Sequence, residues 1–321
     1  MLIYLMPFNK VMYFFKKNIS NCLYIFFIFL TFNIIEFSTK EVLAKTFVVS
    51  KIEVEEKYNL NFDKQKVIDK GFLKAFKILI FKILEKKDQL KIKNILIEDI
   101  KYLIDNFSIL NENFIDQKYQ GIIEVQFDRK KIIKFLEKKN IFSSLPKEME
   151  AFILPIMIKS KNNEIYNLNQ NIFFNLWNDK NKSYFLIKYI LPNEDIEYHS
   201  IIKKNINNLE NYNFNEIIQK YNLDNRIILI LLEDKNKLKI YSRIKFENKN
   251  MLISKNFNNV DINNKKLIND IILEIKHDYE DKWKSLNKLN TTIELPIRVL
   301  LDSKNIKLSK RFKNTLKNLD F

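Results

Sequence analysis

Two periodicities alternate along the chain after residue 45. Apolar residues recur at every second position over Phe47–Val54 and Tyr119–Phe127, which predicts half-buried strands. They recur at helical spacing over Phe62–Glu85, the strongest helix prediction in this part of the chain, and over roughly Ile97–Phe107. The pattern therefore predicts a small α+β unit over residues 45–140, an ordinary size for a domain.

Two local signals refine this first unit. Gly71 and Ala75 lie four residues apart on the long helix, so they leave a shallow spot at which the helix can approach a sheet closely. Asp128 directly follows the second strand and can cap a further helix that runs to Lys139.

Residues 141–150, which include Pro146, are the expected linker to a second unit over residues 151–287. Strands alternate with helices in this unit, which predicts an α/β unit with a mixed sheet. Ile227–Leu232 is entirely apolar, which is typical of a strand at the centre of a sheet. The other strands are expected at Phe152–Ile158, Tyr184–Leu191, Leu238–Phe246 and Met251–Phe257, and the helices at Ile172–Trp177, Asp195–Ile206, Phe214–Tyr221 and Asn263–Leu286.

The end of the chain adds one more strand and one more helix. Thr292–Leu301 predicts the strand and Leu308–Leu319 the helix, which together make an incomplete β-α segment over residues 288–321. The fold class predicted for the whole chain is α+β: a small α+β unit, an α/β unit and this segment.

The first 44 residues have the features of a secretory signal peptide. Their positive front carries Lys10, Lys16 and Lys17. Cys22–Ile35 follows as a short apolar run, and Val42 and Ala44 occupy the −3 and −1 positions of a cut before Lys45. A membrane span needs about 20 apolar residues, so this run is short for one. An uncleaved amino-terminal anchor and a buried helix are the alternatives to a cleaved signal.

Charge and composition narrow the classes of partner. The net charge is +16, with 50 Lys and five Arg: Arg129, Arg226, Arg243, Arg298 and Arg311. This skew is typical of an AT-rich coding sequence, and the basic residues are interleaved with acids, so a solvated Lys-rich surface is expected. An anionic partner such as lipid headgroups or cell-wall polymers is the alternative. No nucleic-acid motif is present, and a nucleic-acid partner is not expected.

The residue inventory limits the possible chemistry. Gly71 and Gly121 are the only two glycines, so a glycine-rich phosphate loop and a dinucleotide fingerprint are excluded. Cys22 is the single cysteine and lies within the predicted signal, so the mature chain has no thiol. The only histidines, His199 and His277, are far apart and have no metal-ligand spacing. No metal and no cofactor are therefore expected.

The remaining candidates favour structural roles. His199 is expected at the surface or at a helix end, and His277 beside Asp278 as a salt-bridged or solvated side chain. The adjacent pairs Glu194–Asp195 and Glu280–Asp281 are interpreted as helix-cap and helix-surface charges rather than a glycosidase pair. Trp177 and Trp283 fall on apolar stripes, which favours core packing over ligand platforms. The sequence predicts no catalytic residue.

Three groups of segments, taken in order, carry a resemblance. They are the first strand with the Gly71/Ala75 helix and Tyr119–Asp128; Leu154–Pro155, Asn171–Trp177 and Leu191–Asp195; and Trp283 with Thr292–Leu301 and the helix after it. This order resembles an uncharacterised family of proteobacterial, mainly alphaproteobacterial, secreted proteins. The second unit is similar in topology to the amino-terminal domain of the Tol-system propeller protein, and the tandem units are similar to flagellar-assembly periplasmic proteins.

These resemblances imply envelope interaction domains rather than enzymes and transfer no catalytic residue. Members of the secreted family usually carry a completed carboxy-terminal β-α domain, whereas this chain ends at Phe321. The expected function is that of a non-catalytic periplasmic interaction or assembly protein with an envelope protein as partner. The alternatives are a carboxylate-dependent hydrolase of cell-wall glycan and an inner-membrane-anchored module whose Lys-rich face lies on anionic lipid.

Overall fold

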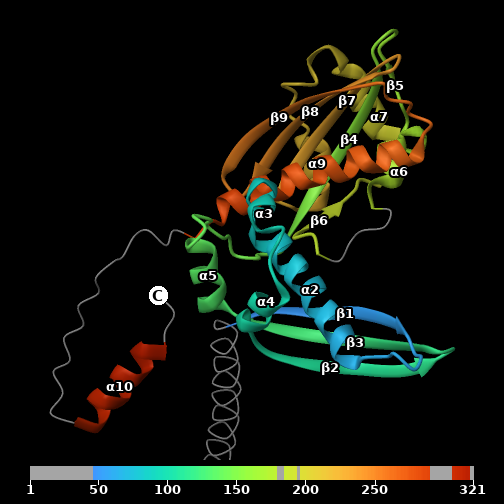
Figure 1. The fold of residues 1–321 in the computed structure, drawn as a ribbon. Helices are drawn as coiled ribbons and strands as arrows, with labels where there is room; N and C mark the ends of the chain where they lie inside the picture. The colour runs from blue at the N-terminus through green and yellow to red at the C-terminus, as the bar shows by residue number, and fades with distance from the viewer. Residues whose placement is uncertain (1–45, 179–183, 194–195, 290–305, 319–321) are drawn as a thin grey trace, which may run out of the picture.

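The computed structural model describes residues 46–178, 184–193, 196–289 and 306–318, and it contains two packed units (Figure 1). Both helices and sheets contribute to them, so the predicted α+β class is confirmed. The predicted signal with Val42 and Ala44, and the predicted strand Thr292–Leu301, lie outside the described residues. None of the described helices has the length and apolar composition needed to cross a membrane.

The first unit is a three-stranded antiparallel sheet with helices packed on one face (Figure 1). The strands are β1 (Thr46–Lys57), β2 (Ile104–Ile115) and β3 (Lys118–Asp128), in the order β1-β3-β2. The helices are α2 (Lys64–Ile83), α3 (Lys86–Gln89), η2 (Leu90–Ile92, a 3-10 helix), α4 (Ile97–Leu103) and α5 (Arg129–Glu137). α2 buries its apolar stripe against alternate residues of β1 and β3, including Ile52 and Ile123.

The helix predicted over Ile97–Phe107 is too long. It ends at Leu103, and the chain continues directly as β2, which the sequence did not predict. Two register shifts interrupt the pairing of β2 with β3, between Ile104 and Asn106 and between Ile109 and Asn111. Each irregularity resets the alternation of apolar and polar residues, so the two-residue period is lost although the strand is present.

The two local signals of the first unit are confirmed. A Cβ added to Gly71 would lie 2.8 Å from Ile123 Cδ1 and 3.3 Å from Val54 Cγ1, so α2 approaches the sheet at this residue as closely as a glycine permits. The side chain of Asp128 accepts a hydrogen bond from the backbone N–H of Lys131 at 3.0 Å, which caps α5.

The second unit is built on a mixed sheet, as predicted, but this sheet has six strands, one more than the sequence predicted. The strand order is β5-β4-β7-β8-β9, with β6 also paired to β4. β6 and β7 are parallel to β4, and the remaining pairs are antiparallel. The strands are β4 (Met149–Lys159), β5 (Glu164–Ile165), β6 (Ile187–Ile190), β7 (Arg226–Asp234), β8 (Lys237–Phe246) and β9 (Lys249–Asn258). The predicted central strand is β7, which lies between β4 and β8.

Helices cover both faces of this sheet. Their bounds are α6 (Ile172–Trp177), α7 (Ile196–Lys204), α8 (Asn215–Ile218) and α9 (Lys265–Leu286), with the 3-10 helices η3 (Leu168–Gln170), η4 (Ile206–Asn208) and η5 (Gln219–Tyr221). α6 and α9 pack on one face, against alternate residues of β7 and β8. α7 and α8 pack on the other face, where the buried residues come from β4 and β7. α10 (Ile306–Asn318) follows as a separate helix.

Backbone and side-chain contacts join the two units where α2 ends. The backbone N–H and the Oγ of Ser144 both donate to the carbonyl of Ile83, at 2.8 and 3.0 Å. Within the stretch expected as a linker, residues 141–148 lie in no helix or strand, although Ser144 is buried, and Met149 and Glu150 already belong to β4. Lys86 N–H donates to Asp281 Oδ1 at 3.0 Å, which fixes the start of α3 to α9.

Candidate anion-binding site

A pocket of about 460 Å³ lies where the helical cover of the second sheet ends. α8 and the loop before it form one wall, and β7, β8 and the edge strand β9 form the floor. Its lining residues are Asn211, Tyr212, Asn213, Phe214, Ile218, Arg226, Ile228, Arg243, Ile244, Lys245, Asn250, Met251 and Leu252. Three of them are cationic and none is acidic.

Strand register brings these cations together. Arg226 on β7 pairs with Lys245 on β8, and Lys245 pairs with Asn250 on β9. Two residues further along, Ile228 pairs with Arg243, and Arg243 pairs with Leu252. Since side chains two residues apart share one face of a strand, all of these side chains lie on the face opposite α9. The pocket floor therefore carries the three cationic side chains of Arg226, Arg243 and Lys245, with the apolar side chains of Ile228 and Leu252 beside them.

Both guanidinium groups are held in place by the wall of the pocket, Arg243 by the loop before α8 and Arg226 by the first residue of α8. Arg243 Nη2 donates to the carbonyl of Tyr212 at 2.5 Å, and its guanidinium lies 5.6 Å from the centre of the Phe214 ring. Arg226 Nη1 donates to Asn215 Oδ1 at 3.2 Å. Because each of these hydrogen bonds uses one end of a five-donor group, further N–H donors remain on both arginines.

The pocket has an excess of positive charge. Within the described residues, neither arginine forms an ion pair with a carboxylate, and Arg243 Nε is buried without a hydrogen-bond partner. Burial lowers the pKa of Arg243, and the neighbouring Arg226 lowers it further, although Tyr241 opposes this shift. Two close cations without a counter-ion repel each other, so a bound carboxylate or phosphate group would relieve that repulsion.

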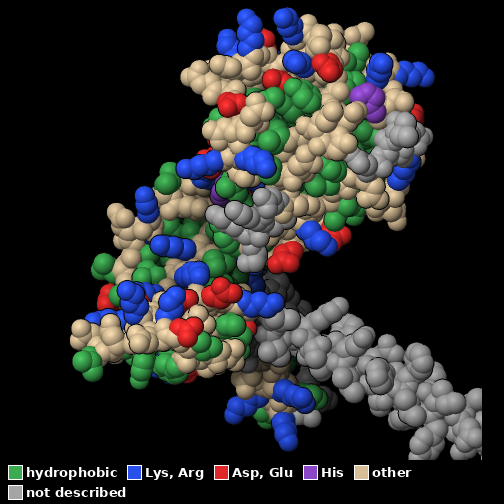
Figure 2. All heavy atoms as spheres, turned by 90° about the vertical axis from the view of Figure 1, so that its right-hand side faces the viewer, with side chains coloured by type: hydrophobic (Ala, Val, Ile, Leu, Met, Phe, Trp, Pro, Cys, Tyr) green, Lys and Arg blue, Asp and Glu red, His purple; other side chains and the backbone are tan. Residues whose placement is uncertain are grey.

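This concentration differs from the charge pattern elsewhere. On the face shown in Figure 2, Lys and Arg side chains are scattered, with Asp and Glu among them. Lys outnumbers Arg ten to one in the chain, yet two of the five arginines lie in one pocket. Sequence reasoning missed the site because the cations meet only across three strands. The signal that could have found it is a tight turn at Lys235–Asn236, which sets Arg226 opposite Lys245.

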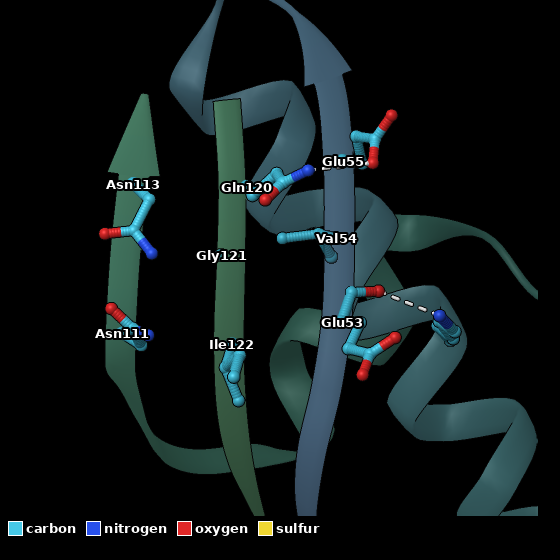
Figure 3. Close-up of a pocket in the computed structure, with 9 residues that line it drawn as sticks. Glu53, Val54, Glu55, Asn111, Asn113, Gln120, Gly121 and Ile122 are labelled. Carbon is cyan, nitrogen blue, oxygen red and sulfur yellow. Dashed lines mark hydrogen bonds between the residues drawn. The ribbon is translucent and has the colours of Figure 1, made fainter. Parts of the chain in front are cut away.

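A second depression, of about 540 Å³, lies on the first sheet and tests the hydrolase alternative (Figure 3). Glu53 and Glu55 line it from β1, with amide side chains from β2 and β3 beside them. Lys118 Nζ lies 2.6 Å from Glu55 Oε1 and lowers the pKa of this exposed carboxyl. A general acid for glycoside cleavage needs a raised pKa, so this pair does not favour hydrolysis.

The prediction that Glu280 and Asp281 are helix-surface charges is wrong. Glu280 is fully buried, and its carboxylate accepts hydrogen bonds from the backbone N–H groups of Leu186 and Ile187, at 3.0 and 2.9 Å. Burial raises the pKa of Glu280, although the two backbone N–H groups and Lys284 oppose the shift. Asp281 is half-buried and binds Lys86 N–H. Both acids hold backbone of neighbouring elements and take no part in an open site.

Two buried lysines lie one helical turn from Glu280 on either side. Lys276 Nζ donates to the carbonyl of Trp177 at 2.5 Å, and burial lowers its pKa to about 8. Lys284 Nζ donates to Leu84 at 3.0 Å and lies 4.4 Å from the centre of the Phe81 ring. Since Leu84 and Phe81 belong to the first unit, Lys284 is part of the contact between the units.

The remaining residues that the sequence analysis singled out and the structure describes pack within the fold and form no binding site. Trp177 and Trp283 are almost completely buried, as predicted. The ring of His277 packs edge-on against Phe81, with centroids 5.3 Å apart. His199 is half-buried within α7, and its Nδ1 has no hydrogen-bond partner among the described atoms. Glu194 and Asp195 lie outside the described residues, which contain no group of three or more potential metal ligands.

Comparisons with known proteins add no relative. No protein-family model matches the chain, and no curated protein matches it significantly. The resemblance to a secreted proteobacterial family therefore stays a prediction.

Proposed function

We propose that this chain is a non-catalytic interaction protein of the cell envelope. In this proposal, the pocket around Arg226 and Arg243 holds a carboxylate of a protein partner. The observation that carries the proposal is the convergence of two arginines and Lys245 in one pocket with no acid among its lining residues. An exported, periplasmic location is part of the proposal and rests on the signal-like first 44 residues.

The chemistry of the pocket favours binding over catalysis. Guanidinium forks suit the planar, bidentate geometry of a carboxylate. Phe214, Ile228, Met251 and Leu252 add apolar surface beside the cations. An acidic side chain flanked by apolar residues uses both parts of this lining, whereas an isolated small anion would use only the cations. A peptide segment of a protein is therefore the class of ligand that fits best.

Calorimetric titration with a synthetic peptide tests this proposal. The probe is acetyl-Leu-Glu-Leu amide, and its Gln counterpart is the neutral control. Loss of a charge-assisted hydrogen bond costs about 1.5–3 kcal/mol, so R243Q and R226Q should each weaken binding by about tenfold or more. R243K should recover part of the loss, because it restores the charge without the fork.

K239Q is the matched control variant. Lys239 lies on the same strand and the same face as Arg243, but outside the pocket lining. Its replacement should leave peptide binding unchanged within about twofold, since exposed charges contribute little. Equal binding by R243Q and K239Q, or equal binding of the Glu and Gln peptides, would contradict the proposed site.

A further inference from the structure

The last described helix, α10, combines a short apolar stripe with many basic residues. Leu308 and Phe312 lie about one helical turn apart and share one face of the helix, and the sequence continues the same four-residue spacing at Leu316. The sequence of Ile306–Asn318 otherwise contains five basic residues and no acid: Lys307, Lys310, Arg311, Lys313 and Lys317. This combination is typical of helices that lie in the interface of a membrane.

No other described helix or strand makes an extended contact with α10 (Figure 1). Leu308 is 57% exposed, and Ile306 at the start of the helix is 84% exposed. A 13-residue helix is marginally stable in water by itself, because its few hydrogen bonds barely offset the cost of nucleation. A surface that covers Leu308 and Phe312 would therefore stabilise the helix.

We infer that α10 binds an anionic lipid surface. The basic residues are attracted to lipid headgroups, while Leu308 and Phe312 enter the boundary of the acyl chains. The long lysine side chains beside the stripe can extend their ammonium groups towards the headgroups as the helix lies flat. The inference is independent of the arginine pocket, which lies in a different unit.

The chain's own open sheet face is a poorer partner for this helix. Its acids include Glu53, Glu55 and Glu124, but Glu55 is already paired with Lys118. Their neighbours on that face are mainly amides, such as Asn111 and Gln120, so the face offers little cover for an apolar stripe (Figure 3). A lipid surface supplies negative charge and apolar depth together.

Sedimentation of the full chain with lipid vesicles tests the inference. Vesicles rich in phosphatidylglycerol are compared with vesicles of phosphatidylcholine alone, because residues 22–35 are expected to bind both kinds equally. Each basic residue near an anionic surface contributes up to about fivefold to binding. K307Q/K310Q/R311Q/K313Q should therefore weaken binding to the anionic vesicles by about tenfold or more, and binding should fall as salt is raised.

The matched control is K235Q/K237Q/K239Q/K249Q, which removes four exposed lysines of the β7–β9 hairpins: three near the β7–β8 turn and Lys249 at the opposite end of the sheet. It should change binding by less than about threefold, since only lysines close to the lipid contribute strongly. An equal loss in both quadruple variants would overturn the inference in favour of general basicity. Wild-type binding by the α10 variant would overturn it as well.

A fluorescence readout locates the contact. F312W adds a half-buried tryptophan to a chain whose Trp177 and Trp283 are buried. Its emission should shift to the blue when anionic vesicles are added and should stay unchanged with phosphatidylcholine. The emission of F312W could instead be blue-shifted already without vesicles and stay unchanged when vesicles are added. This result would show that a protein, either a second copy of the chain or an acidic partner, covers the stripe, and it would overturn the inference.

Discussion

Glu280 is the residue whose replacement should be most costly to stability. Its carboxylate accepts two backbone N–H groups from the start of β6, and the buried ammonium groups of Lys276 and Lys284 lie one turn away on either side. E280A would leave both N–H groups without this acceptor and would remove the buried carboxylate that lies between the two lysines, although Asp281 remains 3.9 Å from Lys284. Removal of one member of such a buried group costs about 3–5 kcal/mol, a large part of a typical total of about 5–15 kcal/mol.

Urea unfolding followed by circular dichroism measures this cost. E274A is the control, because Glu274 lies on the same helix but forms a half-exposed pair with Lys255 at 2.7 Å. Its loss should cost less than about 1 kcal/mol. The loss of unfolding free energy in E280Q should lie between those of E280A and E274A, because the glutamine amide keeps one acceptor oxygen. If E280A cost no more than E274A, the buried carboxylate of Glu280 would not hold the start of β6 to α9 as described.

Three further predictions concern packing, pH and processing. G71A should lower the unfolding free energy by about 1 kcal/mol, although alanine has the better helix propensity, because its Cβ would clash with Ile123 Cδ1. I123V removes that Cδ1 atom, so in a double-mutant cycle G71A should cost nothing in the I123V background. An unchanged cost of G71A in that background would refute the close contact. Burial lowers the pKa of Lys276 to about 8 from 10.5, so the unfolded chain binds more protons between these values. The difference in unfolding free energy between the wild type and K276M should therefore rise as the pH rises from about 8 to 10.5. A difference that does not change with pH would contradict this prediction. Mass spectrometry of the exported protein should find a chain that begins at Lys45, whereas a retained apolar run would indicate an anchor.

Long elements with an uninterrupted period were predictable from the sequence. α2, α9 and β7 each follow one pattern from end to end, and the structure places them within a few residues of the prediction. β2 was missed because its register shifts break the alternation. Local pattern carries no information about such shifts, which depend on the neighbouring strand.

Buried charges and the pocket depend on contacts that a single segment does not encode. Because Glu280 is acidic, the sequence predicted that it lies on the solvent-exposed side of α9. The backbone N–H groups that bind it belong to a segment 93 residues earlier in the chain. Arg226 and Arg243 are 17 residues apart in sequence and share a pocket only through the pairing of β7 with β8. The residue types present in the chain exclude several classes of enzyme. They do not locate a binding site whose residues come together only through the pairing of strands.

The most direct test of the proposed function uses the scarcity of arginine in this chain. Five arginines give a simple nuclear magnetic resonance spectrum of the Nε–H groups, in which each signal can be assigned by single Arg-to-Lys variants. On titration with acetyl-Leu-Glu-Leu amide, the signals of Arg226 and Arg243 should shift together, whereas Arg129 on the first unit should not move. Unchanged Arg226 and Arg243 signals, or equal shifts of all arginines, would contradict a carboxylate-binding pocket at this site.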